Sequence, residues 1–148
     1  MSEHTAHVSW KHGNEAFTYK TYSRNHLWDF GDGHTLAASA APAYLGDPSR
    51  VDPEQAFVAA LASCHMLTFL AVAALEGIVV ENYEDAAIGH LEKGESGKME
   101  ITRVELHPSI TFAPDTEISG EHLRALHHKA HAECFLANSV KTKITTAI

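Results

Sequence analysis

The chain has 148 residues, of which 45% are hydrophobic and 20% charged, a balance typical of one globular domain that buries its own core. Its formal net charge of −8 at pH 7 argues against a nucleic acid or an anionic membrane surface as partner, because both require a basic surface. The first residues, Met-Ser-Glu-His-Thr-Ala-His, have neither a basic nor an apolar segment, so we expect no signal peptide and a cytoplasmic protein.

The first forty residues predict short strands. Residues 8–10 and 16–22 are rich in aromatic and β-branched side chains and indicate two strands around a turn at 11–15. Residues 25–30 and 35–39 indicate a second strand pair, joined by a turn that contains two glycines. This part of the chain is therefore predicted to be a β-rich unit.

A long helix follows, and its start is marked by the tetrapeptide Asp52–Gln55. The aspartate suits the N-cap, the proline suits the first turn, and the glutamine stands three residues on, as in a capping box. The helix should run to about Glu76 and stop at Gly77. Residues 56–75 are apolar enough to span a bilayer, but their many alanines and the missing Lys/Arg-rich flanks favour a helix buried on all sides in a soluble protein.

The second half of the chain predicts a mixture of strands and one more helix. The expected elements are strands at 78–83 and 87–92, a long strand at 99–112 kinked at Pro108, a helix at 121–137 capped by Ser119, and a strand at 140–148. Apolar residues recur in the second helix at three- and four-residue spacings that include Cys134, so this cysteine should face the core. Since no repeat or linker interrupts the chain, we predict one α+β domain over residues 1–148.

Cys64 and Cys134 are the two cysteines of the chain, and each lies on the apolar face of a predicted helix. Seventy positions separate them, which excludes a Cys-x-x-Cys clip. A cytosolic pair of this kind is more often catalytic, metal-binding or inert than a permanent bridge. Thiol redox chemistry requires that the two helices meet and that a cation lowers the pKa of one thiol. Arg24, in an aromatic stretch, is the candidate cation; the alternative is a surface charge on an edge strand.

Glu54 raises a geometric problem. It precedes Cys64 by ten residues, which on a continuous helix puts the two roughly 15 Å apart. Glu54 can therefore act on Cys64 only from a two-fold-related copy or from before a break in the helix. The alternative is that Glu54 complements the helix dipole and nothing more.

A zinc site is the rival interpretation. His127, His131 and Cys134 are spaced i, i+4 and i+7 on one predicted helix, and His65 or Cys64 would supply a fourth ligand. A histidine-rich helix that faces solvent is the plainer explanation of the same spacing.

The stretch Asp52-Pro-Glu-Gln-Ala-Phe-Val-Ala-Ala-Leu-Ala-Ser-Cys-His-Met-Leu-Thr68 resembles the Asn/Asp-Pro-Glu-(x)9-Cys helix of the OsmC/Ohr family, the osmotically inducible and organic hydroperoxide resistance proteins. A second cysteine motif, Ala130-His-Ala-Glu-Cys134, and the upstream Arg24 come in the family's order. Phe135 follows the second cysteine where many members have proline, as in the OsmC-like branch.

The resemblance implies an OsmC-like fold, with β-sheets packed around two long buried helices in an intertwined homodimer. It implies a thiol-dependent peroxidase that reduces organic hydroperoxides, with Cys64 peroxidatic, Cys134 resolving, and Arg24 and Glu54 catalytic. A dithiol such as dihydrolipoamide would be the reductant, with no metal or flavin cofactor. We expect Glu54 to orient Arg24 through a bidentate ion pair, and the aromatic residues Trp28, Phe57 and Phe69 to seal the site. The alternative within the family is a small-molecule or thiol-binding protein without efficient turnover.

Overall fold

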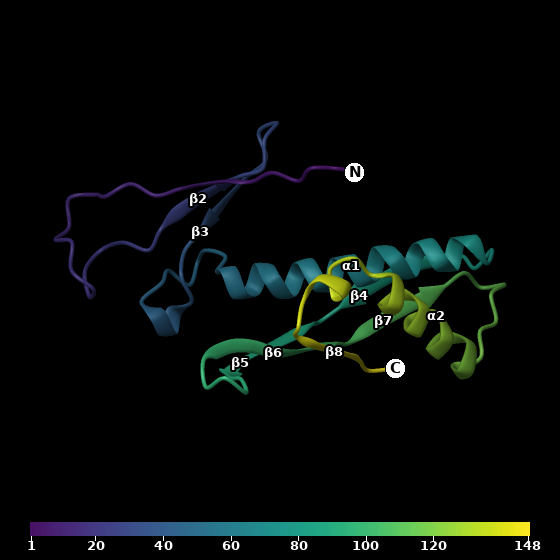
Figure 1. Ribbon diagram of the computed structural model, residues 1–148. Helices are drawn as coiled ribbons and strands as arrows, with labels where there is room; N and C mark the ends of the chain where they lie inside the picture. The colour runs from purple at the N-terminus through teal and green to yellow at the C-terminus, as the bar shows by residue number, and fades with distance from the viewer. The chain divides into compact units, whose positions relative to one another are not determined.

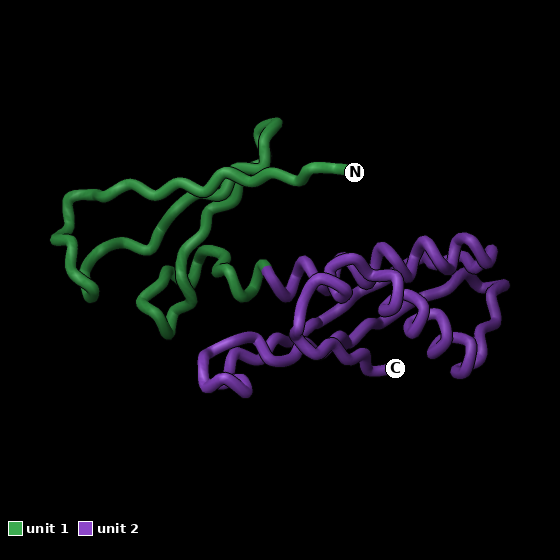
Figure 2. Tube along the Cα trace, in the orientation of Figure 1, with its two compact units in different colours: residues 1–56 green, residues 57–148 purple.

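The computed structural model describes residues 1–148 and divides them into two compact units, residues 1–56 and 57–148 (Figure 2). The first helix, α1, crosses from one unit into the other near its N-terminal end. The prediction of a single domain over 1–148 stays a prediction. The elements are β1 (His7–Ser9), β2 (His26–Asp29), β3 (Thr35–Ala38), η1 (Pro42–Tyr44), α1 (Pro53–Leu75), β4 (Val80–Asp85), β5 (Ile88–Lys93), β6 (Met99–Leu106), β7 (Pro108–Phe112), α2 (Gly120–Glu133), η2 (Ala137–Ser139) and β8 (Lys143–Thr146) (Figure 1).

Unit 1 contains a three-stranded antiparallel sheet in the order β1-β2-β3. The expected hairpin between β2 and β3 is confirmed, and Gly31 and Gly33 take positive φ angles of 85° and 79° in its turn. Such angles favour glycine because a Cβ atom would strain the backbone there.

The strand predicted over residues 16–22 is wrong. This segment forms turns, in which the amide of Tyr22 donates to the carbonyl of Thr18 at 3.0 Å. Its aromatic side chains gather on Trp10 instead of alternating across a sheet: the Trp10 ring centroid lies 5.9 Å from that of Phe17 and 6.3 Å from that of Tyr22. Residues 16–22 therefore have the aromatic composition of a strand, but their side chains pack within a loop and their backbone is not paired as in a strand.

Unit 2 packs its two helices on two small sheets. Phe69 and Val72 of α1 and Leu126 of α2 form one buried cluster, against which residues of β4 and β7 pack. Further toward the N-terminus of α1, Leu61 packs with Val104 of β6 in a second cluster that β8 completes. The helix α1 therefore lies along both sheets, which places its middle turns over the centre of the unit.

The long strand predicted at 99–112 is divided in two, as the proline suggested. Pro108 begins β7, which pairs with β4, whereas β6 pairs with β5 and, in parallel, with β8. The amide of His107, between them, donates to the Asp85 carboxylate at 2.7 Å. Proline has no amide hydrogen to offer a ladder, so the first position of a strand suits it.

The bounds of α1 follow the prediction closely. The amide of Gln55 donates to Asp52 Oδ1 at 2.8 Å, and the Asp52 amide donates to Gln55 Oε1 at 3.2 Å, which together make a reciprocal capping box. At the other end the helix stops at Leu75, and Gly77 takes a φ of 73°. The helix start and stop read from the sequence are confirmed.

The burial of α1 differs from the expectation. One face is covered, but the other, formed by Ala60, Ser63, Leu67, Ala71 and Ala74, is exposed in the single chain. The side chain of Leu67 keeps 60% of its surface open. By length and composition alone α1 is able to cross a membrane. We call the exposed stripe from Ala60 to Ala74 the open face of α1.

Helix α2 is capped as predicted but ends early. The Ser119 hydroxyl accepts a hydrogen bond from the His122 amide at 3.1 Å. The last helical residue is Glu133, so Cys134 is the C-terminal cap, with an extended backbone (φ −70°, ψ 114°), and not a helical residue. The predicted end at residue 137 is therefore wrong, because the chain turns there into η2. Cys134 is nevertheless 1% exposed, as its apolar spacing predicted.

Candidate thiol site

The two cysteines meet in unit 2. Cys64 lies in the middle of α1 and Cys134 at the end of α2, and the Cys134 thiol donates a hydrogen bond to the Cys64 sulfur at an S–S separation of 2.8 Å. Both are free thiols. The condition for thiol chemistry stated from the sequence, that the two helices bring the cysteines together, is met by the packing of α1 on α2.

The two thiols have different surroundings. Cys64 is partly exposed, whereas Cys134 is buried. Burial raises the pKa of Cys134, and the hydrogen bond to Cys64 raises it further. The Ala137 amide donates to the Cys134 sulfur at 3.5 Å and offsets part of that effect. Cys134 is therefore held as a protonated thiol, and Cys64 is the sulfur that a solute can reach.

A pair of histidines lies beside the thiols. His65, the residue after Cys64, is 2% exposed, and His127 of α2 is 3% exposed. His65 Nε2 and His127 Nδ1 are hydrogen-bonded at 3.0 Å. Burial lowers the pKa of each imidazole to about 4, and the nearby His127 and His131 add to the effect on His65. Both side chains are therefore neutral at neutral pH.

The residues suggested for a zinc site do not converge. His127 is bonded to His65, and Cys134 to Cys64, so the candidate ligands are divided between two separate contacts. His131 is exposed on α2. No three His, Cys, Asp or Glu side chains come together in a geometry that could hold a metal ion. The arrangement gives the zinc interpretation no support.

Arg24 and Glu54 both belong to unit 1, where they line the same pocket. Its volume is about 540 Å³, and its aromatic wall is formed by Trp10, Phe17, Tyr22 and Tyr44. The guanidinium carbon of Arg24 lies 3.8 Å from the centroid of the Tyr22 ring. A cation over an aromatic wall suits a small organic molecule with a polar end.

The predicted bidentate pair between Glu54 and Arg24 is not formed within the chain. Arg24 Nη1 donates to the Tyr22 carbonyl at 2.6 Å, and Nη2 donates to the Tyr19 carbonyl. Backbone carbonyls and a tyrosine ring thus satisfy the guanidinium without a carboxylate. The two residues share a pocket but make no ion pair.

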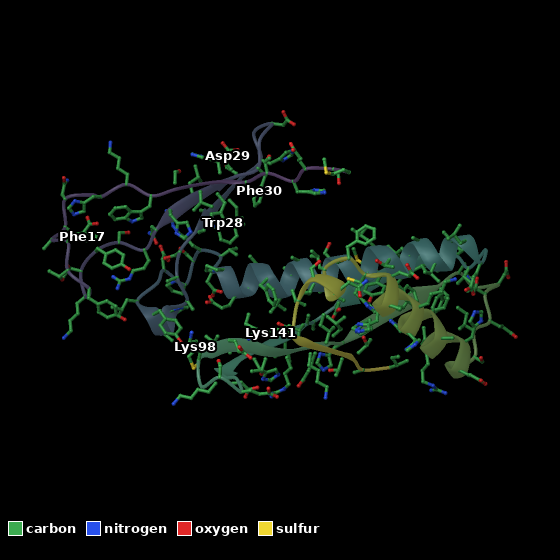
Figure 3. All side chains as sticks on the ribbon, in the orientation of Figure 1. Phe17, Trp28, Asp29, Phe30, Lys98 and Lys141 are labelled. Atoms are coloured by element: carbon green, nitrogen blue, oxygen red, sulfur yellow. The ribbon has the colours of Figure 1, made fainter.

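The aromatic residues expected to seal the site, Trp28, Phe57 and Phe69, do not line the pocket that holds Arg24 and Glu54. Trp28 donates its indole N–H to His26 Nε2 at 2.9 Å, and Phe57 and Phe69 pack in the two cores of unit 2. Figure 3 labels Phe17 and Trp28, which both belong to unit 1. The pocket residues Trp10 and Phe17 lie in segments that the sequence predicts as strands, and nothing in the sequence marks Tyr44 as their neighbour. The signal that these three share in the sequence is their aromatic character.

The comparisons with known proteins agree on the family. The sequence model described as OsmC-like protein matches residues 46–148. A solved OsmC-like protein of unknown function from Vibrio cholerae is 47% identical, with 100% of this chain and 99% of that chain covered and a TM-score of 0.95. A comparison with curated proteins gave no match.

More distant structures share the fold. An organic hydroperoxide resistance protein OsmC from Legionella pneumophila is 23% identical, with 100% of this chain and 98% of that chain covered and a TM-score of 0.72. An organic hydroperoxide resistance protein from Elizabethkingia anophelis is 19% identical, with 99% and 93% covered and a TM-score of 0.72. The α+β architecture of these proteins is the one expected from the sequence. By its sequence match and its fold, this chain belongs to the family of OsmC-like proteins.

Proposed function

We propose that the protein is a thiol-dependent peroxidase that reduces organic hydroperoxides to alcohols. The observation that carries the proposal is the 2.8 Å separation of the Cys64 and Cys134 sulfur atoms, which come from opposite halves of the sequence. Two reduced thiols at hydrogen-bonding distance, one open and one buried, suit a cycle in which one sulfur attacks and the other resolves.

The cycle has three steps. The Cys64 thiolate attacks the distal oxygen of the hydroperoxide, the O–O bond breaks, and the alkoxide leaves as an alcohol after taking up a proton. Cys64 is then a sulfenic acid. The Cys134 thiol condenses with it, so that an S–S bond forms and the hydroxyl leaves as water. A dithiol such as dihydrolipoamide reduces this disulfide by exchange and is itself oxidised to its cyclic disulfide.

Cys64 is the attacking thiol in this scheme. Its partial exposure supports access by a hydroperoxide, whereas Cys134 is 1% exposed. The raised pKa of Cys134 supports its role as the thiol that waits in the protonated form until a sulfenic acid is present. A reducing, cytoplasmic compartment would keep both thiols ready for the first step.

In the proposal Arg24 stabilises the Cys64 thiolate, and Glu54 orients Arg24. Their common position in one aromatic pocket supports a shared role at a small-molecule site. The Arg24 guanidinium donates its hydrogen bonds to the carbonyls of Tyr19 and Tyr22. The proposal therefore requires Arg24 to replace these bonds by an ion pair with Glu54 when substrate binds. Because ten residues of helix separate Glu54 from the Cys64 of its own chain, we assign the Arg24 and Glu54 that act on one Cys64 to a second copy of the chain, in which both line the same pocket.

A homodimer is part of the proposal. The open face of α1 consists of small or apolar side chains, and Leu67 is 60% exposed. A helix that is apolar all round is normally covered all round. A second copy that places its own α1 on this face would bury it and form a two-fold interface between like surfaces.

A binding protein without efficient turnover is the second candidate. The state of Arg24 favours it, because a guanidinium held by two carbonyls and a tyrosine ring has no carboxylate to orient it toward a thiol. Such a protein would hold a small organic molecule in the pocket of unit 1 and leave its thiols reduced.

A thiol count separates the two candidates. Reduced protein is mixed with about one equivalent of tert-butyl hydroperoxide under anaerobic conditions, and free thiols are titrated after quenching. We expect both thiols of each chain to be lost, and dihydrolipoamide to restore them. Cys64→Ser should abolish the reaction, whereas Cys134→Ser should retain the first step and leave a sulfenic acid that dimedone traps. Unchanged thiols in the wild-type protein would reject the peroxidase and leave the binding protein.

A further inference from the structure

The hydrogen-bonded pair of His65 and His127 is buried between α1 and α2, with the two side chains 2% and 3% exposed. The two ring planes are nearly parallel, at 4°, with centroids 5.3 Å apart. The ring of Phe69 lies 4.5 Å from that of His127, centroid to centroid. A polar pair in this position is unexpected, because the residues around it form an apolar core.

The pair connects the two segments that carry the thiols. His65 is the next residue after Cys64 on α1. His127 lies on α2 seven residues before Cys134, the residue that caps the C-terminal end of that helix. The contact between the imidazoles and the contact between the sulfur atoms are thus made by the same two helices.

One proton arrangement satisfies the pair best. His65 Nδ1 is buried and has no partner. An unpaired acceptor costs less than an unpaired buried N–H, so His65 carries its proton on Nε2 and donates it to His127 Nδ1. His127 then carries its proton on Nε2. His127 is one of the residues that line a cavity of about 320 Å³, together with His131 of α2 and Thr146 of β8.

A directional contact restrains helix packing in a way that apolar contacts do not. The hydrophobic effect is not directional, so apolar contacts fix the relative position of two helices less narrowly than a hydrogen bond does. A hydrogen bond at 3.0 Å weakens when its atoms separate or turn. Deletion of one partner would leave the other imidazole buried and unpaired.

We propose that His65 and His127 are positioning residues for the dithiol: their hydrogen bond fixes α2 against α1 so that Cys134 stays within bonding reach of Cys64. This inference rests on the proposed peroxidase function only in the use that the cell would make of the dithiol. The restraint itself acts on the equilibrium between two thiols and a disulfide, whatever the oxidant is. The pair neither touches the substrate nor exchanges a proton with it.

The test measures that equilibrium directly. Full-length protein is equilibrated with mixtures of reduced glutathione and glutathione disulfide, and the fraction of Cys64–Cys134 disulfide is determined by alkylation and mass spectrometry. Each turn of the reaction oxidises the two protein thiols to one disulfide and reduces one glutathione disulfide to two glutathione thiols. No peroxide is present, so a failed peroxidase proposal leaves the measurement intact.

The dithiol–disulfide equilibrium of the wild type is compared with that of two double variants. His65→Leu/His127→Leu replaces the hydrogen bond by apolar contacts of similar volume, so it should fold. His65→Gln/His127→Asn keeps amide groups at the positions of the bonded nitrogens, Nε2 and Nδ1. His128→Leu, on the exposed side of α2, is the matched control for an added leucine.

We expect the leucine pair to lower the equilibrium constant for disulfide formation about tenfold, because the two thiols spend less time within reach. The amide pair and His128→Leu should stay within about twofold of wild type. A leucine pair that folds with an unchanged equilibrium constant would overturn the proposal, and so would an amide pair that is no better than the leucine pair. Urea unfolding of each variant separates this effect from stability, since the leucine pair should be as stable as wild type or more so.

Discussion

The buried histidine pair should make the protein less stable as the pH falls from 7 to 5. Burial lowers the pKa of His65 and of His127 to about 4, whereas an unfolded chain has histidines near 6.5. Below pH 6.5 the unfolded chain therefore binds protons that the folded chain does not take up. The contribution of the two neutral histidines to the unfolding free energy is fully present above about pH 6.5. It decreases as the pH falls toward 4, and below pH 4 it changes no further.

The size of the loss follows from the two pKa values. One histidine with a pKa of about 4 folded and 6.5 unfolded removes about 2 kcal/mol of unfolding free energy between pH 7 and pH 5. The two imidazoles share one hydrogen bond and are close to His131, so their combined loss should lie between about 2 and 4 kcal/mol. This is a large fraction of the 5–15 kcal/mol that is usual for a domain.

The carboxylates do not obscure this window. The pKa of Asp47 is lowered by hydrogen bonds from Ser49, and that of Glu92 by a hydrogen bond from Thr102. A lowered carboxyl pKa contributes stability that is present above the unfolded value and is lost as the pH falls through the folded value. At pH 5 these carboxylates are still largely ionised in both states.

The assay is urea unfolding at pH 7 and pH 5, followed by far-UV circular dichroism at one protein concentration. Wild type should lose about 2 to 4 kcal/mol between the two pH values. His65→Leu/His127→Leu should lose much less, and His128→Leu should behave as wild type. If the wild type and the leucine pair show the same pH dependence, the pKa values assigned to the buried pair are wrong.

Three further predictions concern the helix α1 and its contacts. Asp52→Ala removes the capping carboxylate and should lower the unfolding free energy by about 1 kcal/mol; an unchanged melting temperature would show that the capping box contributes nothing. Gly89→Ala would place a methyl group 2.4 Å from Val58 Cγ2 and should cost about 1–3 kcal/mol, with recovery in a Val58→Ala background as the check on that clash. Leu67→Glu on the open face of α1 should convert the expected dimer to a monomer by light scattering, whereas a monomeric wild type would refute the assignment of this face to a second copy.

Local features of the sequence were enough for both ends of α1 and for the N-terminal cap of α2, but not for the end of α2. The capping box at Asp52, the stop at Gly77 and the cap at Ser119 each depend on side chains within a few residues of one another, so their structure follows from the local order of residue types. The family could also be recognised from the Pro-Glu-(x)9-Cys spacing. Composition misled where aromatic residues packed on each other, as in the turns of residues 16–22.

The contacts between helices needed the folded chain. Apolar spacing predicted that Cys134 is buried, but not that α2 ends at Glu133, directly before it, nor that the Cys134 sulfur lies against Cys64. The pairing of His65 with His127, 62 positions apart, could not be predicted from the sequence. Histidines are frequent throughout the chain, and no spacing distinguishes these two from the others. Within the single chain Arg24 bonds to carbonyls of its own loop instead of Glu54, and a sequence does not rank such competing acceptors; the pair between two copies stays a prediction.

The amino-acid sequence by itself determined where α1 begins and ends, where α2 is capped at its N-terminus, which residues are apolar enough to be buried, and which family the chain resembles. These depend on short-range order and on composition. Tertiary structure decided which buried residues are neighbours, and hence that two thiols and two imidazoles meet between α1 and α2. The physical reason is that a hydrogen bond or a sulfur contact acts over about 3 Å, whereas the packing that brings its partners together is set by the whole core.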